Sequence, residues 1–226
     1  MIIIENLSVS YGKNQILSDL KLNLQDSMAH GIVGLNGAGK TTFLNTLFGI
    51  KKCDQGGILY NNRVLGKKDI AYVESENFFY SNITGNEYLR LFENPKFETE
   101  MWKNIFNLPL NKMIDTFSTG MRKKLAILAA LKTNKPILIL DEPFNGLDIE
   151  SCEILRLIIS KLCDKGKTVI ITSHIIDTLP EICRFIHHIT DMTIETYVSE
   201  DFSLLKSIIS DKINDKISLE LEDALK

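Results

Sequence analysis

Alternating apolar and polar residues mark the beginning of the chain as β structure. Residues 1–11 and 16–26 are predicted to be strands joined by a short glycine-containing turn. In the second segment, leucines occupy alternate positions from residue 20 to 24, which is typical of a half-buried antiparallel strand. Leu17 is out of phase with these leucines, so the regular alternation begins only at Asp19.

Further along the chain, short apolar runs predict strands of a different kind. Continuous runs such as 136–140 are typical of parallel strands that are covered on both faces. The remaining predicted strands are, in chain order, 31–34, 56–60, 70–73, 136–140, 168–171 and a closing hairpin at 186–190 and 193–198.

Helical spacing of the apolar residues replaces the strand pattern between about residues 83 and 135. The best helix in this stretch, 121–132, is apolar nearly all round and is therefore expected to be buried. Later helices are predicted at 147–164 and 175–183, and an amphipathic helix is predicted from residue 201.

These patterns predict an α/β fold: a mixed or parallel sheet flanked by helices, with N-terminal antiparallel strands and an inserted helical lobe. We expect a single domain over 1–226. Its predicted parts are the core at 1–82 and 136–200, the lobe at 83–135, and the C-terminal tail at 201–226.

Composition narrows the functional classes. The 226 residues are 44% hydrophobic and 24% charged, as is ordinary for a globular protein. The net charge of −3 argues against an extended nucleic-acid-binding face. The N-terminus lacks the pattern of a signal peptide, and no apolar run approaches the length of a membrane-spanning helix. We therefore expect a soluble, cytoplasmic protein that reaches a membrane only through a partner.

The segment GLNGAGKTT, residues 34–42, fits the phosphate-binding pattern G-x-x-x-x-G-K-[ST]. Its glycines let successive backbone N–H groups point at an anion, Lys40 supplies a mobile cation, and the Thr41 hydroxyl can reach Mg²⁺. The alternative is an ordinary glycine-rich turn. A strand pattern before the segment and a helix pattern after it favour nucleotide binding.

Two other buried strands also end in residues that can perform chemistry, and ligands in open parallel sheets lie beyond the carboxyl ends of the strands. Asp141 is placed to hold Mg²⁺, the alternative being a solvated acidic turn. Glu142 is the candidate base for an attacking water, or else a structural acid. His174 is a candidate to contact the γ-phosphate and orient that water, although an isolated histidine usually has no such role.

An unusual charge pattern begins at Ser118, a plausible helix N-cap. Arg122, Lys123 and Lys124 fill the first turn, where the helix dipole disfavours cations. Either an anion docks at this helix end, or the three side chains simply point into water at a cost of about 0.3–1 kcal/mol each.

Taken in order, these motifs resemble those of the nucleotide-binding domain of ABC transporters, over residue 1 to about residue 198. The signature motif separates this family from other phosphate-loop ATPases. The matching segments are GLNGAGKTT for Walker A, ILILDEP (137–143) for Walker B, FSTGM (117–121) for the LSGGQ signature, NGLD (145–148) for the D-loop, and TSH (172–174) for the switch histidine.

The resemblance implies ATP and Mg²⁺ as ligands and assigns roles to individual residues. Glu142 and His174 would be catalytic, and Asp148 would belong to the D-loop. Mg²⁺ would be held by Thr41, Asp141 and either Ser75 or Glu76. ATP would contact Tyr11, which falls where the family stacks an aromatic ring on adenine, and Asn36, Gly37, Ala38, Gly39, Lys40, Thr41 and Thr42. A second molecule's nucleotide would meet the signature residues Ser118, Thr119 and Gly120.

Two segments depart from the family pattern. The family's glutamine loop falls within IAYVESEN, residues 70–77, where Ser75 takes the expected position beside Glu76 and glutamine is absent. In the signature, Thr119 replaces the first glycine and Met121 the glutamine. Signatures of the S-x-G-M-[KR] kind are most similar to those of exporters of drugs, bacteriocins or polysaccharides with a separate membrane chain.

The family resemblance also implies partners. Two such domains, in a homodimer here, pair head to tail, and ATP closes the pair around the bound nucleotides. An integral membrane permease subunit would receive the motion at the cytoplasmic face of the membrane. Two alternatives remain: a soluble ABC ATPase with an assembly or regulatory role, and a nucleotide-binding module with little turnover. Glu142 and His174 argue against the second.

Overall fold

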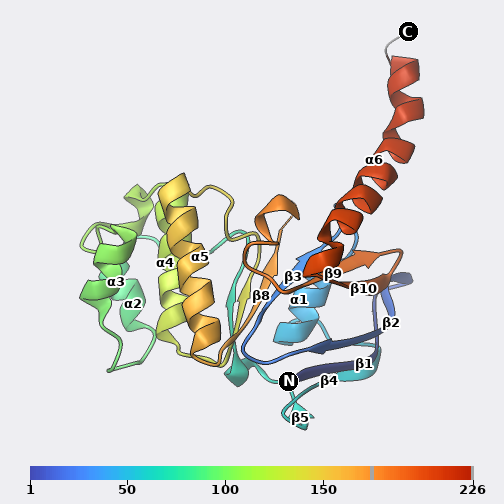
Figure 1. Cartoon of the computed structure of the whole chain (residues 1–226). Coiled ribbons are helices and arrows are strands. Elements are labelled where there is room, and N and C mark those ends of the chain that lie inside the picture. The colour runs from blue at the N-terminus through green and yellow to red at the C-terminus, as the bar shows by residue number, and fades with distance from the viewer. Residues whose placement is uncertain (174–175, 225–226) are drawn as a thin grey trace.

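The computed structural model describes residues 1–173 and 176–224 and contains two sheets, with helices covering one of them (Figure 1). The first sheet is antiparallel, with the order β2-β1-β4-β5. Its strands are β1 (Ile2–Tyr11), β2 (Asn14–Leu24), β4 (Gln55–Tyr60) and β5 (Arg63–Val64). The N-terminal antiparallel strands predicted from the alternation are confirmed.

The phase change in β2 has a local cause. Asp19 has a φ of 49°, in the left-handed region that favours glycine and asparagine, and the pairing of β1 with β2 shifts register between Leu7 and Val9. This irregularity lets both Leu17 and Leu20 point into the core, where they are 0% and 1% exposed.

The second sheet has the order β10-β9-β3-β8-β7-β6 and is parallel except where β10 pairs antiparallel with β9. Its apolar strands are covered on both faces: Ile137 and Ile139 pack into one core cluster, and Leu138 and Leu140 into the other. The strands are β3 (Ala29–Val33), β6 (Ile70–Val73), β7 (Ile137–Leu140), β8 (Thr168–Thr172), β9 (Phe185–Thr190) and β10 (Thr193–Val198).

Between β6 and β7 the chain is helical, as the spacing predicted. This stretch contains α2 (Gly85–Arg90), α3 (Thr99–Phe106) and α4 (Thr119–Lys132). It lies beside α5 (Ile149–Asp164), away from the antiparallel sheet (Figure 1). A capping box starts α2: Glu87 N–H donates to Thr84 Oγ1 at 3.2 Å, and Thr84 N–H donates to the Glu87 carboxylate at 2.7 Å.

The prediction of a helix at 175–183 was wrong. Residues 176–178 form a single 3-10 turn, and Ile182 and Cys183 then both donate to the Leu179 carbonyl. Pro180 explains the difference, because it has no N–H to donate and its ring disfavours a helical conformation in the preceding residue. The predicted switch residue His174, just before this turn, lies outside the described residues.

The predicted C-terminal helix is present as α6 (Phe202–Ala224). Its first turns pack onto the body through Phe202, Leu205 and Ile209, which are buried, and the helix then runs outward from the two sheets (Figure 1). Within the part of the chain that the structure describes, no helix combines the length and apolar character needed to cross a membrane.

Two buried histidines connect β3, β9 and β10. His30 Nε2–H donates to the Gln25 carbonyl at 2.9 Å, so His30 Nδ1 must accept the hydrogen bond from His187 Nε2–H at 3.1 Å. The Thr196 hydroxyl then donates to His187 Nδ1 at 2.9 Å. Burial is the main cause that lowers the pKa of both histidines, and it lowers that of His187 to about 3.

These histidines predict a loss of stability on mild acidification. Unfolding releases them to an ordinary pKa near 6.5, so below that pH the unfolded chain binds protons that the folded chain does not. Urea unfolding between pH 7 and 5 should show a stability that falls with pH, and His187, with its folded pKa of about 3, should contribute a limiting slope of about 1.4 kcal/mol per pH unit. The His187→Gln variant should be less stable at pH 7 and should show a smaller slope than the wild type. An unchanged slope would contradict the assignment.

Candidate functional site

A cavity of about 300 Å³ lies where β3 passes through the phosphate loop, residues 34–42, into α1 (Lys40–Phe48). Gly39 caps this helix with a φ of 106°, and a Cβ there would lie 3.0 Å from both Ile16 and Leu17. Only glycine fits both the backbone angle and the space. The first turn of α1 contains no acidic residue and no described side chain caps it, so its N–H groups remain directed toward an anion.

Lys40 reaches back over the loop, where its ammonium donates to the Gly34 carbonyl at 2.7 Å and the Leu35 carbonyl at 3.3 Å. Burial lowers the pKa of Lys40, while the carboxylates of Glu142 and Asp141 raise it. The Lys40 ammonium is therefore bonded to backbone oxygens of its own loop, and the charges of Glu142 and Asp141 favour its protonated form.

The ends of β7 and β8 meet at the same cavity through one hydroxyl group. Thr172 Oγ1 donates to the Asp141 carboxylate and accepts from Glu142 N–H at 2.9 Å. Asp141 is 5% exposed; burial raises its pKa, and the Thr172 hydrogen bond lowers it. Glu142 has a φ of 48°, a left-handed conformation that is strained for a residue with a side chain.

Most of the predicted ATP and metal residues line this cavity, and some do not. Ser75 belongs to the lining, whereas Glu76 and Tyr11 are not among its residues. Tyr11 is 51% exposed at the end of β1, with the Lys51 ammonium 4.7 Å from its ring centroid. Ala38, which is half-buried, packs against the core instead. The complete lining is Ile16, Asn36, Gly37, Gly39, Lys40, Thr41, Thr42, Ser75, Asp141 and Glu142.

Oxygen atoms dominate the metal-binding capacity of this cavity. The Thr41 and Ser75 hydroxyls and the Asp141 carboxylate are donors of the kind that Mg²⁺ prefers. Among the described residues, no group of three or more His, Cys, Asp and Glu side chains could hold a metal by itself. That fits Mg²⁺, which is usually held by one or two carboxylates together with the phosphates of a substrate.

The signature residues lie outside the cavity, at the start of α4. Ser118 is the helix N-cap, its hydroxyl accepting from Met121 N–H at 3.2 Å. A Cβ on Gly120 would come within 2.8 Å of the Gly146 carbonyl oxygen, so the signature segment packs directly on the D-loop. Asp148 in turn caps α5, its carboxylate accepting from Ser151 N–H at 2.7 Å.

The three cations that follow the signature find separate partners. Arg122 donates to the Asp115 carbonyl at 3.2 Å, and the Lys124 ammonium is 3.6 Å from the Asp148 carboxylate. Lys123 does not point into water: it is buried, with only 5% of its surface exposed. Burial lowers its pKa, and Asp141 and Glu142 raise it.

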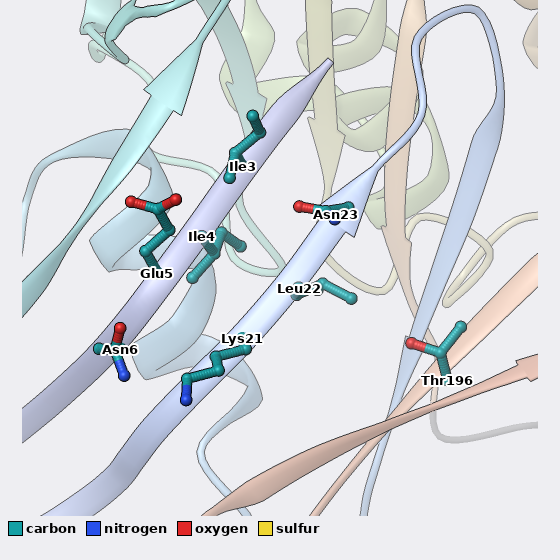
Figure 2. Close-up of a pocket in the computed structure, with 8 residues that line it drawn as sticks. All are labelled: Ile3, Ile4, Glu5, Asn6, Lys21, Leu22, Asn23 and Thr196. Carbon is teal, nitrogen blue, oxygen red and sulfur yellow. The ribbon is translucent and has the colours of Figure 1, made fainter.

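A larger hollow, of about 680 Å³, lies beside β1 and β2, and Figure 2 draws the residues that line it. Side chains from these two strands line it, and Thr196 of β10 lies across from them (Figure 2). It contains isolated polar groups such as Glu5 and Lys21 but no convergent set of the kind found at the phosphate loop. The chemistry-bearing residues of three strands meet at the smaller cavity.

Sequence reasoning missed three contributors to this arrangement. Ile16 lines the cavity, Thr172 joins Asp141 to the Glu142 backbone, and Lys123 lies beneath them. Two of the three belonged to segments that the sequence had singled out, Thr172 to TSH (172–174) and Lys123 to the cationic first turn of α4, but neither segment identified the partners.

A family model described as ABC transporter matches residues 17–145. The lantibiotic transport ATP-binding protein SrtF of Streptococcus pyogenes is 33% identical over 201 residues, covering 82% of this chain and 85% of that protein. The bacitracin transport ATP-binding protein BcrA of Enterococcus faecalis is 31% identical over 197 residues, covering 80% of this chain and 64% of that protein.

Solved structures agree with this relationship. An ATP-binding subunit of an ABC transporter superposes with a TM-score of 0.83 at 25% identity, covering 89% of this chain and 91% of that one. A dimeric ATP-binding cassette bound to ADP and phosphate shares the fold, with a TM-score of 0.78 at 22% identity, covering 88% of this chain and 99% of that one. The matching family model, the relatives and the phosphate-loop site lead to one conclusion: this chain belongs to the ABC transporter family, as an ATP-binding subunit with ATPase activity.

Proposed function

We propose that this chain powers export across a membrane, working at its cytoplasmic face with a separate membrane permease subunit. The export direction is supported by relatives whose names give lantibiotic and bacitracin transport. The signature segment STGMR supports the same subgroup, because it has the S-x-G-M-[KR] pattern noted above.

The observation that carries the mechanism is that the phosphate loop and the signature residues of one chain do not line the same cavity. The phosphate loop faces the cavity, whereas Ser118, Thr119 and Gly120 lie at the start of α4 and do not line it. A nucleotide bound at the loop is therefore contacted by the signature of a second copy. The dimeric form of a cassette with the same fold agrees with this arrangement.

The part of the chain that carries the signature is proposed to move as a helical lobe, residues 83–135, against the core. The core comprises residues 1–82 and 136–200, and the tail begins at residue 201. Closing of two copies on ATP and reopening after hydrolysis would move these lobes, and the membrane subunit would follow them.

Each residue of the cavity has a proposed task in holding the nucleotide. The phosphate-loop N–H groups and Lys40 bind the phosphates, which would draw the ammonium away from the Gly34 carbonyl. Thr41, Asp141 and Ser75 would hold Mg²⁺, and the metal, when bound, neutralises charge on the phosphates. Tyr11 is exposed, and its ring, beside the Lys51 ammonium, is proposed to stack on an adenine. Asp148 is proposed to belong to the D-loop, residues 145–148, which packs beside the signature.

Hydrolysis requires a proton acceptor for the attacking water, and we assign this task to Glu142. Glu142 lines the same cavity as the phosphate loop, and its backbone N–H donates to the Thr172 hydroxyl. His174, which follows Ser173 at the end of β8, is proposed to orient the same water.

The Glu142→Gln substitution tests the catalytic assignment. Removing a general base costs typically 10²–10⁴-fold in rate, so kcat for ATP hydrolysis should fall by at least about a hundredfold while ATP binding persists. With ATP and Mg²⁺ the variant should accumulate as a dimer in size-exclusion chromatography. The exposed Glu93→Gln variant is the control and should behave as the wild type. Undiminished hydrolysis in Glu142→Gln would refute the assignment, and a monomer at saturating ATP would refute the composite site.

The Gly120→Ala substitution tests the signature wall. The added methyl group would meet the Gly146 carbonyl 2.8 Å away, so the signature must shift relative to the D-loop. We expect ATP-driven dimerisation and hydrolysis to weaken about tenfold or more, because a misplaced group costs up to 10²-fold, while fluorescent-ATP binding to the monomer stays unchanged. Gly57→Ala is the matched control, because a methyl group there would meet nothing within 4 Å beyond its chain neighbours. Equal activities of the two variants would contradict a role for this wall.

Affinity purification from native membranes tests the coupling to transport. A tagged copy should recover an integral membrane subunit, and recovery should survive a salt wash that removes loosely bound proteins. Recovery with only soluble proteins would instead favour the alternative function, an ABC ATPase with an assembly or regulatory role.

A further inference from the structure

Lys123 is a charged side chain buried in the first turns of the helix that begins at the signature. Its ammonium donates to the Ser75 carbonyl at 2.7 Å and to the Glu142 carbonyl at 3.4 Å. A buried ammonium without such partners would be strongly unfavourable. These two contacts therefore account for a cation at a position that the helix dipole disfavours.

The two carbonyl groups come from different walls of the phosphate-loop cavity. Ser75 follows β6 and Glu142 follows β7, and both residues line the cavity. A single side chain thus joins α4 to both strand ends. A displacement of α4 relative to the sheet must stretch these contacts or carry the two backbone segments with it.

The Glu142 backbone depends on support of this kind. Its φ of 48° is disfavoured for a residue with a Cβ and persists only where the surroundings hold it. Thr172 accepts from the Glu142 N–H at 2.9 Å, and Lys123 donates to the Glu142 carbonyl at 3.4 Å. The peptide groups on both sides of the Glu142 Cα are therefore fixed, and they set the direction in which its carboxylate points.

We propose that Lys123 is a positioning residue that holds Glu142 in its strained conformation and ties that conformation to the placement of the signature helix. The proposal rests on the proposed function, in which Glu142 accepts the proton of the attacking water. Lys123 itself acts through the backbone carbonyl of Glu142 and takes no part in the proton transfer.

The first test is Lys123→Met, which keeps a long flexible side chain and removes the donors. Because misplacement of a catalytic group by about 1 Å can cost 10²-fold, kcat for ATP hydrolysis should fall about tenfold to a hundredfold, and KM for ATP should change less than about twofold. Lys132→Met, at the far end of the same helix, is the matched control and should retain wild-type kinetics.

The second test is a double-mutant cycle, which separates positioning from general structural damage. If Lys123 acts through the Glu142 carboxylate, adding Lys123→Met to Glu142→Gln should lower the residual single-turnover rate by less than about twofold. An equal loss in both backgrounds would show an independent effect and would overturn the proposal. Wild-type kcat in Lys123→Met, or loss of ATP binding or of cooperative unfolding in that variant, would also overturn it.

The role of Glu142 and the role of Lys123 are refuted by different results. Wild-type hydrolysis by Glu142→Gln would remove the proposed base, and with it the function on which this inference rests. An inactive Glu142→Gln variant together with a fully active Lys123→Met variant would leave the proposed function standing and reject only the role of Lys123.

Discussion

Parallel pairing of β8 with both β3 and β7 is the constraint on which the site depends. It brings the carboxyl ends of three strands to one edge of the sheet, where the phosphate loop, Thr172 and the Asp141–Glu142 pair lie together. Thr172 completes the junction by bonding to both acidic residues. Helices and the antiparallel sheet cover both faces, so a slip by one residue would exchange the side chains of a strand between two differently packed core clusters.

The polar contacts of this site are arranged around backbone groups as much as around side chains. Lys40 donates to a carbonyl of the phosphate loop, and Lys123 donates to the carbonyls of Ser75 and Glu142. The Glu142 N–H donates to the Thr172 hydroxyl. Removing a partner from a buried charge costs free energy of folding, so these contacts fix the loops relative to one another. In the proposed dimer, the signature of a second copy of the chain would cover the open side of this site.

The elements themselves were largely predictable from the sequence. Period-two alternation identified β2, continuous apolar runs identified β3, β7 and β8, and helical spacing identified α4 and α5. The helix expected at 175–183 failed because apolar spacing was weighed above Pro180, whose lack of a donor ends a helix whatever the pattern around it. The phosphate-loop residues were recognisable because their spacing is local.

Local patterns thus determined the fold class, the phosphate loop and the two acidic residues, since each depends on neighbours in sequence. The tertiary structure alone decided three features of the cavity: Ser75 lines it while Glu76 does not, Thr172 bonds to the Asp141 carboxylate and to the Glu142 N–H, and Lys123 is buried. The sequence showed three adjacent cations in one helical turn. Which of them turns inward depends on carbonyl groups contributed by strands distant in the chain, and those meet only when the sheet has formed.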